Sequence, residues 1–431
     1  MSIWTANSNM PKFKVLDRDI DTDVLIIGGG LAGVLCAYTL DLAGIDYVLL
    51  EKDRICSKTT ANTTAKITLQ HGLIYSKIQK EFGLDYAKLY YDANKEALEE
   101  YRRLCKNIDC DYTPADSYIY SLTDGAKLKK EYDILTMLGA EAVYTKSTEL
   151  PFSVTGAVGV KNQASFNPLK FVSRIAKNLK IYENSKVVEL IGNTAKTEKY
   201  RVNAKKIIVA THFPFINKHG FYFLKEYQER SYVLALEGGG ELSDMYLDEA
   251  DTGFSFRGYG NYILLGGGSH RTGKGECGFE KLEKAAKSFY PNAEIKYKWA
   301  TQDCITLDGI PYIGRYSRTT QNLYVASGFN KWGMSSSMVA AKLLFDIISG
   351  KESKYEKLFS PSRSIVRKQL ATNSYEALCG WLTFGKKRCP HLGCALNYNK
   401  FEHSWDCSCH GSRFDERGKL LDNPANDDLT L

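Results

Sequence analysis

Four metal-binding side chains near the C-terminus have a regular spacing. Cys389 and His391 are separated by one residue, residues 392–406 follow, and Cys407 and His410 are then separated by two residues. Thiolate and imidazole groups are ligands for zinc and for iron–sulfur clusters. Because each of two short loops supplies one thiolate and one imidazole, the spacing predicts a four-ligand metal centre.

A glycine-rich turn near the N-terminus has the pattern Gly28-x-Gly30-x-x-Gly33. It follows the apolar run 23–27, which suits a buried parallel strand, and it precedes a helix. The first glycine permits a tight turn, the second lets the backbone approach a pyrophosphate, and the third allows close packing of helix on strand. Glu51 closes the next strand and can accept hydrogen bonds from an adenosine ribose. The pattern predicts a site for FAD or NAD; the alternative is a glycine turn without a ligand.

The elements that must position these residues follow from apolar runs and helical spacing. The predicted strands are 23–27, 47–50, 206–210, 232–236, 262–265 and 323–326, and the predicted helices are 31–43, 86–105 and 335–348. The first strand, glycine turn, helix and second strand form a βαβ unit. The fold class that we predict is α/β (α+β), with a Rossmann-like dinucleotide domain.

The hydroxyl-rich loop 57–66 comes next and suits contacts with phosphate and flavin. With this loop, the chain resembles the D-amino-acid-oxidase-like family of FAD-dependent oxidoreductases. Later segments have the same order as in that family: a segment that contacts adenine, a strand whose end covers the nucleotide, and two stretches that close over the flavin. These segments are 184–187, 206–211, 308–314 and 328–333.

The resemblance, over roughly residues 20–350, implies FAD as cofactor, an interleaved antiparallel-sheet substrate domain, and an amine or amino acid as substrate. In that family, a hydride passes from the carbon that bears nitrogen to the flavin, so orientation matters more than a strong base. The residues expected at the cofactor are Gly28, Gly30, Leu31, Ala32, Gly33, Glu51, Lys52, Thr59, Thr60, Thr64, Val187, Ala210, Thr211, Gly309, Gly328, Lys331, Trp332 and Gly333.

Three side chains are candidates for the catalytic, substrate-facing part of this site. Lys331 lies between the closing glycines, where the resemblance puts it beside the flavin. Arg257 and His270 belong to the intervening stretch and are expected to line a pocket. The competing interpretations are a surface charge for Arg257, a hydrogen-bonded loop residue for His270, and simple packing for Trp332.

The C-terminal ligand set resembles that of Rieske [2Fe–2S] domains, in which two thiolates bind one iron and two imidazoles bind the other. The resemblance implies a disulfide between Cys394 and Cys409 and a proline loop at 423–425 that covers the cluster. Two departures are a short base sheet and Ser408 in place of the usual proline. A zinc site and a module without metal are the alternatives.

The reduction potential of such a cluster depends on hydrogen bonds to its sulfurs. Ser412 can donate one, but Phe414 stands where high-potential members of the Rieske family carry a tyrosine hydroxyl. We therefore expect a low-potential cluster.

The chain has 431 residues, enough for more than one domain. The charged segment 351–364, which contains a proline, is the best linker candidate. We expect a flavin-dependent domain over 1–355 and a small all-β Rieske-type domain over 356–431. Within the first, the FAD-binding part is expected at about 20–85, 150–215 and 300–350, and the substrate part at about 86–149 and 216–299.

Composition limits the partners. The formal net charge of +7 is spread along the chain and not gathered in a basic arm, so nucleic acid is not the expected partner. The apolar run 24–40 contains four glycines, which argues against a membrane span. The first residues lack the apolar core of a signal peptide, so we expect a cytoplasmic protein.

The leading hypothesis is an FAD-dependent oxidoreductase that oxidises an amine or amino acid and passes electrons through the cluster to an unidentified acceptor. A second hypothesis reverses the flow, so that an external donor reduces the cluster. A third makes the C-terminal module a clusterless tail on a flavin oxidase, and a fourth is a binding protein without chemistry. The substrate, the direction of electron flow and the oligomeric state are not encoded in these motifs.

Overall fold

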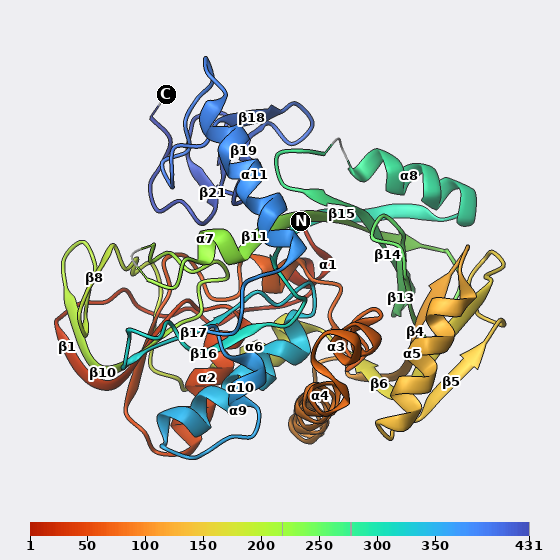
Figure 1. Ribbon diagram of the computed structural model, residues 1–431, viewed down its shortest axis with the longest axis horizontal. Helices are drawn as coiled ribbons and strands as arrows, with labels where there is room; N and C mark the ends of the chain where they lie inside the picture. The colour runs from red at the N-terminus through yellow and green to blue at the C-terminus, as the bar shows by residue number, and fades with distance from the viewer. Residues whose placement is uncertain (218, 276–277, 431) are drawn as a thin grey trace.

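A computed structural model describes residues 1–217, 219–275 and 278–430. It contains three β-sheets. Two of them form the body of the molecule, and the third lies at one end with helix α11 (Lys368–Leu382), drawn in blue in Figure 1. The mixed α/β body and the small C-terminal sheet confirm the predicted fold class.

The first sheet holds the βαβ unit. Its order is β16 (Tyr312–Arg315), β17 (Leu323–Ser327), β10 (Arg201–Val209), β1 (Ile20–Ile27), β2 (Tyr47–Leu50) and β7 (Ile181–Tyr182), with β9 (Thr194–Lys196) and β8 (Glu189–Ile191) attached at β10. The central strands are parallel. They are apolar because helices and further chain cover both faces, which leaves no solvent face.

The second sheet is largely antiparallel and is interleaved with the first along the chain. Its order is β15 (Glu294–Thr306), β11 (Glu226–Glu237), β14 (Tyr262–Arg271), β13 (Ser255–Tyr259), β12 (Met245–Asp248), β4 (Thr113–Ser121), β6 (Gly156–Ser165) and β3 (Lys66–Ile67), with β5 (Ala142–Thr145) on β6. The long strands β11 and β15 run toward the C-terminal domain (Figure 1).

The remaining helices cover these sheets. They are α1 (Ile3–Ala6), α2 (Leu31–Leu42), the 3₁₀ helix η1 (Thr59–Asn62), α3 (Ile74–Phe82), α4 (Leu84–Cys105), α5 (Gly125–Met137), α6 (Pro168–Ile175), α7 (Tyr222–Lys225), α8 (Gly278–Phe289), α9 (Gly333–Ile348) and α10 (Glu356–Phe359). Helices α2 and α9 pack on each other beside the first sheet. In the described part of the chain, no helix combines the length and the apolar character needed to cross a bilayer.

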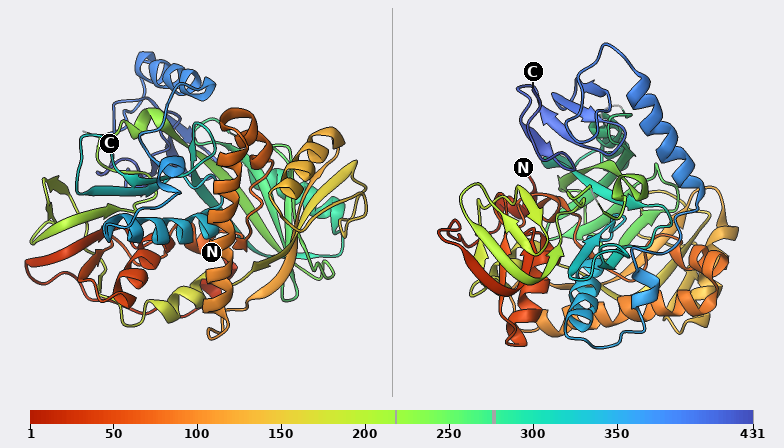
Figure 2. Two further views of the ribbon diagram at one scale, coloured as in Figure 1. Left: turned by 60° about the horizontal axis from the view of Figure 1, so that its bottom comes forward. Right: turned by 60° about the vertical axis from the view of Figure 1, so that its left-hand side comes forward.

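The C-terminal sheet has the order β18 (Leu396–Asn399), β19 (Ser404–Cys407), β20 (Arg413–Asp415) and β21 (Leu420–Asp422). All its pairings are antiparallel. The sequence analysis did not predict α11, which precedes this sheet. Figure 2 shows that α11 lies at the outer edge of the molecule in both further views.

The segment expected to be a linker packs tightly on the body. Leu358 and Phe359 of α10 are buried because they are the apolar positions of an otherwise charged stretch. Arg363 forms a buried ion pair with Asp308, with nitrogen–oxygen distances of 2.7 and 2.8 Å. This pair fixes the chain between the two parts of the molecule against the segment 308–314.

The ion pair leads to a stability prediction. Asp308→Ala leaves the Arg363 guanidinium buried without its counter-charge, so we expect the free energy of unfolding to fall by about 3–5 kcal/mol. Urea unfolding followed by circular dichroism measures this change. The control is Asp23→Ala, which removes the partner of the exposed Lys205 and should change little. Equal effects of the two substitutions would contradict the buried role of the pair.

Candidate functional site

The glycine turn joins β1 to α2 at the carboxyl end of the first sheet. A Cβ atom on Gly33 would lie 1.9 Å from the carbonyl oxygen of Gly28, so only glycine lets the helix approach the turn this closely. Glu51, at the end of β2, accepts hydrogen bonds from the backbone N–H groups of Gly29 (2.6 Å) and Asp53 (2.8 Å). The carboxylate is therefore held at the edge where a ribose is expected.

A cavity of about 690 Å³ opens from this turn and extends to β11 and β15. Every residue predicted at the cofactor lines it, apart from Gly33, which packs behind the turn. These lining residues are Gly28, Gly30, Leu31, Ala32, Glu51, Lys52, Thr59, Thr60, Thr64, Val187, Ala210, Thr211, Gly309, Gly328, Lys331, Trp332 and Gly333. The lining thus includes both the glycine turn expected to bind the nucleotide and the segments expected to close over the flavin. This combination fits FAD.

The three catalytic candidates have different positions. Lys331 lines the cavity, and its Nζ lies 2.7 Å from a carboxylate oxygen of Glu229. Arg257 is buried and lies outside the cavity lining; it donates hydrogen bonds to the carbonyl oxygens of Thr64 and Ala65. His270 also lies outside the lining, with its ring 3.1 Å from the Tyr232 hydroxyl. Arg257 thus contacts the cofactor loop from behind.

A histidine that the sequence analysis missed lines the cavity beside Trp332. The His71 ring stacks on the Trp332 ring with centroids 4.8 Å apart, and its nitrogens lie within hydrogen-bond distance of Tyr90 and Ser335. Burial lowers the pKa of His71 to about 3, so the ring is neutral. No local motif marks this residue, because its partners come from distant helices.

The substrate side of the cavity is rich in carboxylates. Glu229, Asp248, Asp251 and Asp303 line it, and the single arginine among its lining residues is Arg54, at the nucleotide end. Burial raises the pKa of Asp303 to about 6. Burial and, to a smaller extent, the charge of Arg257 lower the pKa of the nearby Lys66 to about 7.

The predicted metal ligands lie together in the C-terminal domain. The rings of His391 and His410 are 4.9 Å apart in an edge-to-face arrangement. The Nδ1 atom of each ring is buried and has no hydrogen-bond partner among the described residues. The thiols of Cys389 and Cys407 interact, so that the pKa of Cys407 falls well below its usual value. Two buried imidazole nitrogens without partners beside two thiols fit a two-histidine, two-cysteine metal centre.

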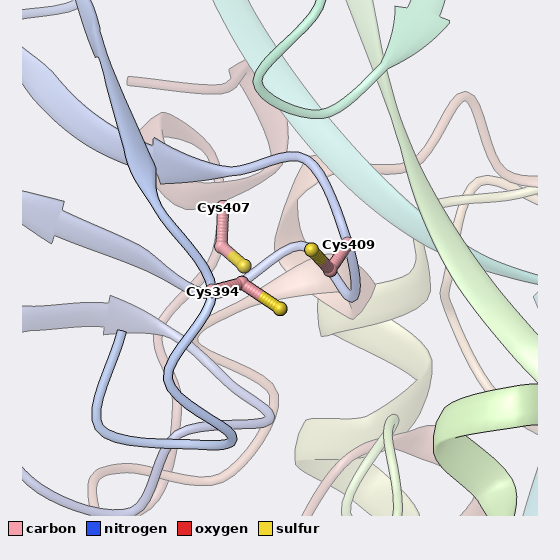
Figure 3. Close-up of side chains that lie close together, drawn as sticks. All are labelled: Cys394, Cys407 and Cys409. Carbon is pink, nitrogen blue, oxygen red and sulfur yellow. The ribbon is translucent and has the colours of Figure 1, made fainter. Parts of the chain in front are cut away.

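Cys394 and Cys409 lie beside this ligand set. Their sulfurs and that of Cys407 are within 4.8 Å of one another, and Figure 3 shows Cys394 next to Cys407 and Cys409, which belong to one loop. The thiols are unbonded in the structure, so the disulfide stays a prediction. Three thiolates alone would form another metal site, but that set leaves both histidine Nδ1 atoms unused.

Comparisons with known proteins agree with this geometry. Residues 23–347 match the family model described as FAD dependent oxidoreductase, and residues 365–430 match the Rieske [2Fe-2S] domain. The chain belongs to the FAD-dependent oxidoreductase family and carries a C-terminal Rieske domain. Its cofactors are FAD and a [2Fe–2S] cluster.

Three similar proteins extend the comparison. The chain is 34% identical to the Bacillus subtilis protein named for a Rieske 2Fe-2S centre, YhfW, over 98% of this chain and 95% of the relative. It is 25% identical to the gamma-glutamylputrescine oxidoreductase of Escherichia coli, over 82% and 89% of the two chains. The fold matches that of glycine oxidase from Geobacillus kaustophilus with a TM-score of 0.67 and 19% identity, covering 80% of this chain and all of that one.

In this flavin-dependent oxidoreductase, a hydrogen bond orients one of the predicted cluster ligands. The Nε2 atom of His391 lies 2.9 Å from the Oδ1 atom of Asn217, which belongs to the FAD-dependent oxidoreductase domain. Because an amide oxygen is an acceptor, Nε2 carries the proton and Nδ1 keeps a lone pair for iron. Metal-binding histidines usually have such a second partner. The sequence gives no signal for Asn217, since it is 174 residues from its partner.

The second sheet lies between the cavity and the second cluster-binding loop of this oxidoreductase, while the Rieske segments 420–423 and 425–426 themselves line the cavity. Along β11, Tyr227, Glu229 and Ser231 line the cavity. Between them, the Gln228 side chain donates to the carbonyl oxygens of His410 (2.9 Å) and Asn423 (2.7 Å). Side chains alternate between the two faces of a strand, so one strand contacts both sites.

The side chains of the neighbouring strand β15 likewise alternate between the cavity and the cluster-binding loop. Thr301, Asp303 and Ile305 line the cavity. Gln302 points to the other face, where its amide nitrogen donates to the carbonyl oxygen of Gly411 (2.8 Å) and to the Gln228 side chain (2.9 Å). The second cluster-binding loop is therefore held by two buried glutamines.

Arg271, at the end of β14, also holds the second cluster-binding loop. Its guanidinium donates to the carbonyl oxygens of Ser408 (2.8 Å) and Cys409 (2.9 Å). The sequence analysis considered the adjacent His270 and did not assign Arg271 to the cluster domain. Only the folded strand shows that Arg271 points toward the Rieske domain.

The Rieske domain leads to a prediction about its reduction potential. Ser412 is buried and accepts a hydrogen bond from the N–H of Ala425 (3.0 Å), which leaves its own proton for a cluster sulfur. Phe414 is fully buried and has no hydroxyl to add a second bond. We expect a potential low in the Rieske range of about −150 to +300 mV. Ser412→Ala should lower it by about 40 mV, the equivalent of one net hydrogen bond of about 1 kcal/mol.

Redox titration followed by electron paramagnetic resonance measures this potential. Ser408→Ala, which changes a neighbouring serine that lies between the loop cysteines, is the control and should leave the potential unchanged. A potential near the top of the range, or no shift with Ser412→Ala, would contradict the role of Ser412.

Proposed function

We propose that this oxidoreductase oxidises a cationic amine and passes the electrons through its Rieske cluster to a separate acceptor. The flavin accepts the electron pair as hydride, and the cluster carries single electrons. The substrate ammonium loses a proton to solvent and its carbon loses the hydride to the flavin, so the product is a protonated imine. The chain's own residues bind and orient the amine and hold the two sites at a fixed separation.

The observation that carries the proposal is the shared wall between the sites. Alternate side chains of β11 and β15 face the cavity and the cluster-binding loop, so a single sheet separates them. Gln228 and Gln302 are buried, and their hydrogen bonds to loop carbonyls fix the distance across the wall. A clusterless C-terminal tail on a flavin oxidase would not require this set of buried hydrogen bonds to the loop.

The proline loop is a second physical connection between the two sites. Asn423 donates from its side chain to the carbonyl oxygens of Thr211 (2.7 Å) and Phe213 (2.9 Å), at the end of β10. Two residues later, Ala425 lines the cavity and donates to Ser412 of the cluster-binding loop. One loop thus contacts the flavin cavity on one side and the cluster-binding loop on the other.

The charges at the substrate end favour an amine over an amino acid. A carboxylate substrate would need cations. Arg257 lies outside the lining, Lys331 is paired with Glu229, and burial lowers the pKa of Lys66 to about 7, which leaves Lys77 to face the carboxylates at positions 229, 248, 249, 251 and 303. Asp303 and Asp248 leave an excess of negative charge for a substrate ammonium. The similarity to an oxidoreductase named for gamma-glutamylputrescine agrees with an amine substrate.

The visible spectrum of the purified protein, with iron and flavin counted on the same sample, is the first test. We expect two irons per flavin and Rieske-type absorbance that changes with dithionite. His410→Ala should remove the iron and the cluster signal and keep the flavin. The matched control is His403→Ala, which changes an exposed histidine of the same domain that pairs with Glu416.

Anaerobic mixing with a panel of primary and secondary amines then tests electron transfer. An amine that bleaches the flavin should also produce the paramagnetic signal of the reduced cluster in the wild type and in His403→Ala. The signal should be absent in His410→Ala, although the flavin still bleaches. A cluster that stays oxidised in the wild type while the flavin is fully reduced would refute the proposed path.

The carboxylate at the cavity wall gives a pH prediction. As pH falls, Lys66 gains a positive charge near pH 7 and Asp303 loses its negative charge near pH 6, and both changes weaken the binding of a cation. We expect KM to rise between pH 8 and pH 5. Asp303→Asn should raise KM at pH 8 by about tenfold or more, the value of a charge-assisted hydrogen bond, and reduce the pH dependence.

Steady-state kinetics with the best amine of the panel measures this effect. Asp133→Asn, which removes an exposed carboxylate of α5, is the control. If Asp303→Asn leaves KM unchanged at every pH, the acidic wall does not bind the substrate.

A further inference from the structure

Helix α11 has an unusual distribution of side chains. Its buried side carries Asn373, Glu376 and Gly380. Asn373 accepts a hydrogen bond from Arg271 (3.0 Å), and Glu376 pairs with Lys274. The inward face of the helix is therefore polar, and it is bound to the flavin-binding part of the chain.

The outward face of α11 is apolar. Tyr375, Leu378, Trp381, Leu382 and the following Phe384 are between 52% and 83% exposed. Residues 375, 378 and 382 have the spacing of one helix face. We call these five residues the α11 apolar face. A water-exposed helix normally has the opposite arrangement, and an exposed apolar patch of this kind marks an interaction site.

Basic residues follow the α11 apolar face in the sequence. Lys386 donates to Asn397, Lys387 lies over the Trp405 ring, and Arg388 donates to backbone carbonyls. Glu376 is the sole acidic residue between positions 357 and 401, and it is already paired with Lys274. The stretch 358–400 thus carries more positive than negative charge, and Lys368 is exposed at the other end of the helix, next to Arg367, which pairs with Glu81.

We propose that the α11 apolar face is a docking site for the surface of an anionic phospholipid membrane. Aromatic and leucine side chains insert at the boundary between headgroups and acyl chains, and neighbouring lysines attract anionic headgroups. The position of α11 at the outer edge of the molecule leaves this face open to a flat surface (Figure 2).

The charges argue against a second copy of the chain as the occupant. A symmetric dimer brings the same patch of each subunit together, so the basic residues that follow the face would be doubled within one interface. Like charges at a contact oppose association. A membrane with anionic lipids supplies the opposite charge as well as an apolar layer.

Helix α11 lies directly against the Rieske cluster-binding loops. A Cβ atom on Gly380 would lie 2.5 Å from the sulfur of Cys409, so the helix backbone packs directly against the cluster-binding loops. Gln228 and Gln302 bind the second of these loops from the sheet whose other face lines the flavin cavity. Docking at α11 therefore brings the cluster-binding loops close to the lipid surface.

Vesicle co-sedimentation of the full-length holoenzyme tests the proposal. The probes are vesicles of phosphatidylcholine mixed with phosphatidylglycerol and vesicles of phosphatidylcholine alone. We expect binding to the mixed vesicles that weakens as salt rises. Leu378→Ser with Leu382→Ser should reduce the partition coefficient at least about tenfold, because two apolar side chains no longer insert. Lys386→Gln with Lys387→Gln should remove the preference for anionic lipid.

Met137→Ser, at an exposed apolar residue of α5, is the matched control and should bind as the wild type does. An unchanged Rieske absorption spectrum shows that each variant is folded. Absence of binding to mixed vesicles, or equal binding by the Leu378 and Leu382 double variant, would overturn the proposal. Sedimentation equilibrium provides the other decisive result: a dimer that the double variant dissociates would assign the face to a second copy.

Discussion

The hydrogen bonds of Gln228 and Gln302 to the cluster-binding loop constrain the rest of the structure. Buried amides must have partners, and the loop carbonyls supply them. The partners come from a domain that is distant in the sequence, so the two domains satisfy each other's polar groups. The Rieske domain is for this reason fixed against the second sheet by buried hydrogen bonds, and is not a module on a flexible tether. The buried pair of Arg363 and Asp308 fixes the connecting segment in the same way.

Much of each cofactor site could be predicted because its residues are contiguous in the sequence. The turn from Gly28 to Gly33 and the two cluster-binding loops carry their chemistry in a few adjacent residues. The predicted strands and the helices predicted at 31–43, 86–105 and 335–348 are found in the structure with small shifts of their ends, because apolar runs and helical spacing determine them. The family comparisons confirm both cofactors. The individual contacts of each predicted residue with a bound cofactor stay predictions.

The residues that join the sites could not be predicted, because their partners are far away in the sequence. Gln228, Gln302 and Asn217 have no local motif, and their function depends on which strand face meets the Rieske domain. The segment 226–231 did contain a signal: polar residues occupy both faces of a strand in the interior of the chain. Such a strand indicates a wall between two polar sites. Helix α11 was missed because we predicted helices from apolar residues that face the core, and the apolar residues of α11 are exposed instead.

The side chains of β11 point alternately to the cavity and to the cluster-binding loop, and this limits how the length of the strand can change during evolution. A strand that is lengthened by one residue turns each following side chain to the opposite face. An insertion of a single residue before Gln228 would move this amide into the flavin cavity and turn Glu229 toward the cluster-binding loop. An insertion of two residues would preserve both faces but shift the register with β15. Length changes in this strand therefore alter both redox sites at once, so they are expected to be much rarer here than in the surface loops of the same sheet.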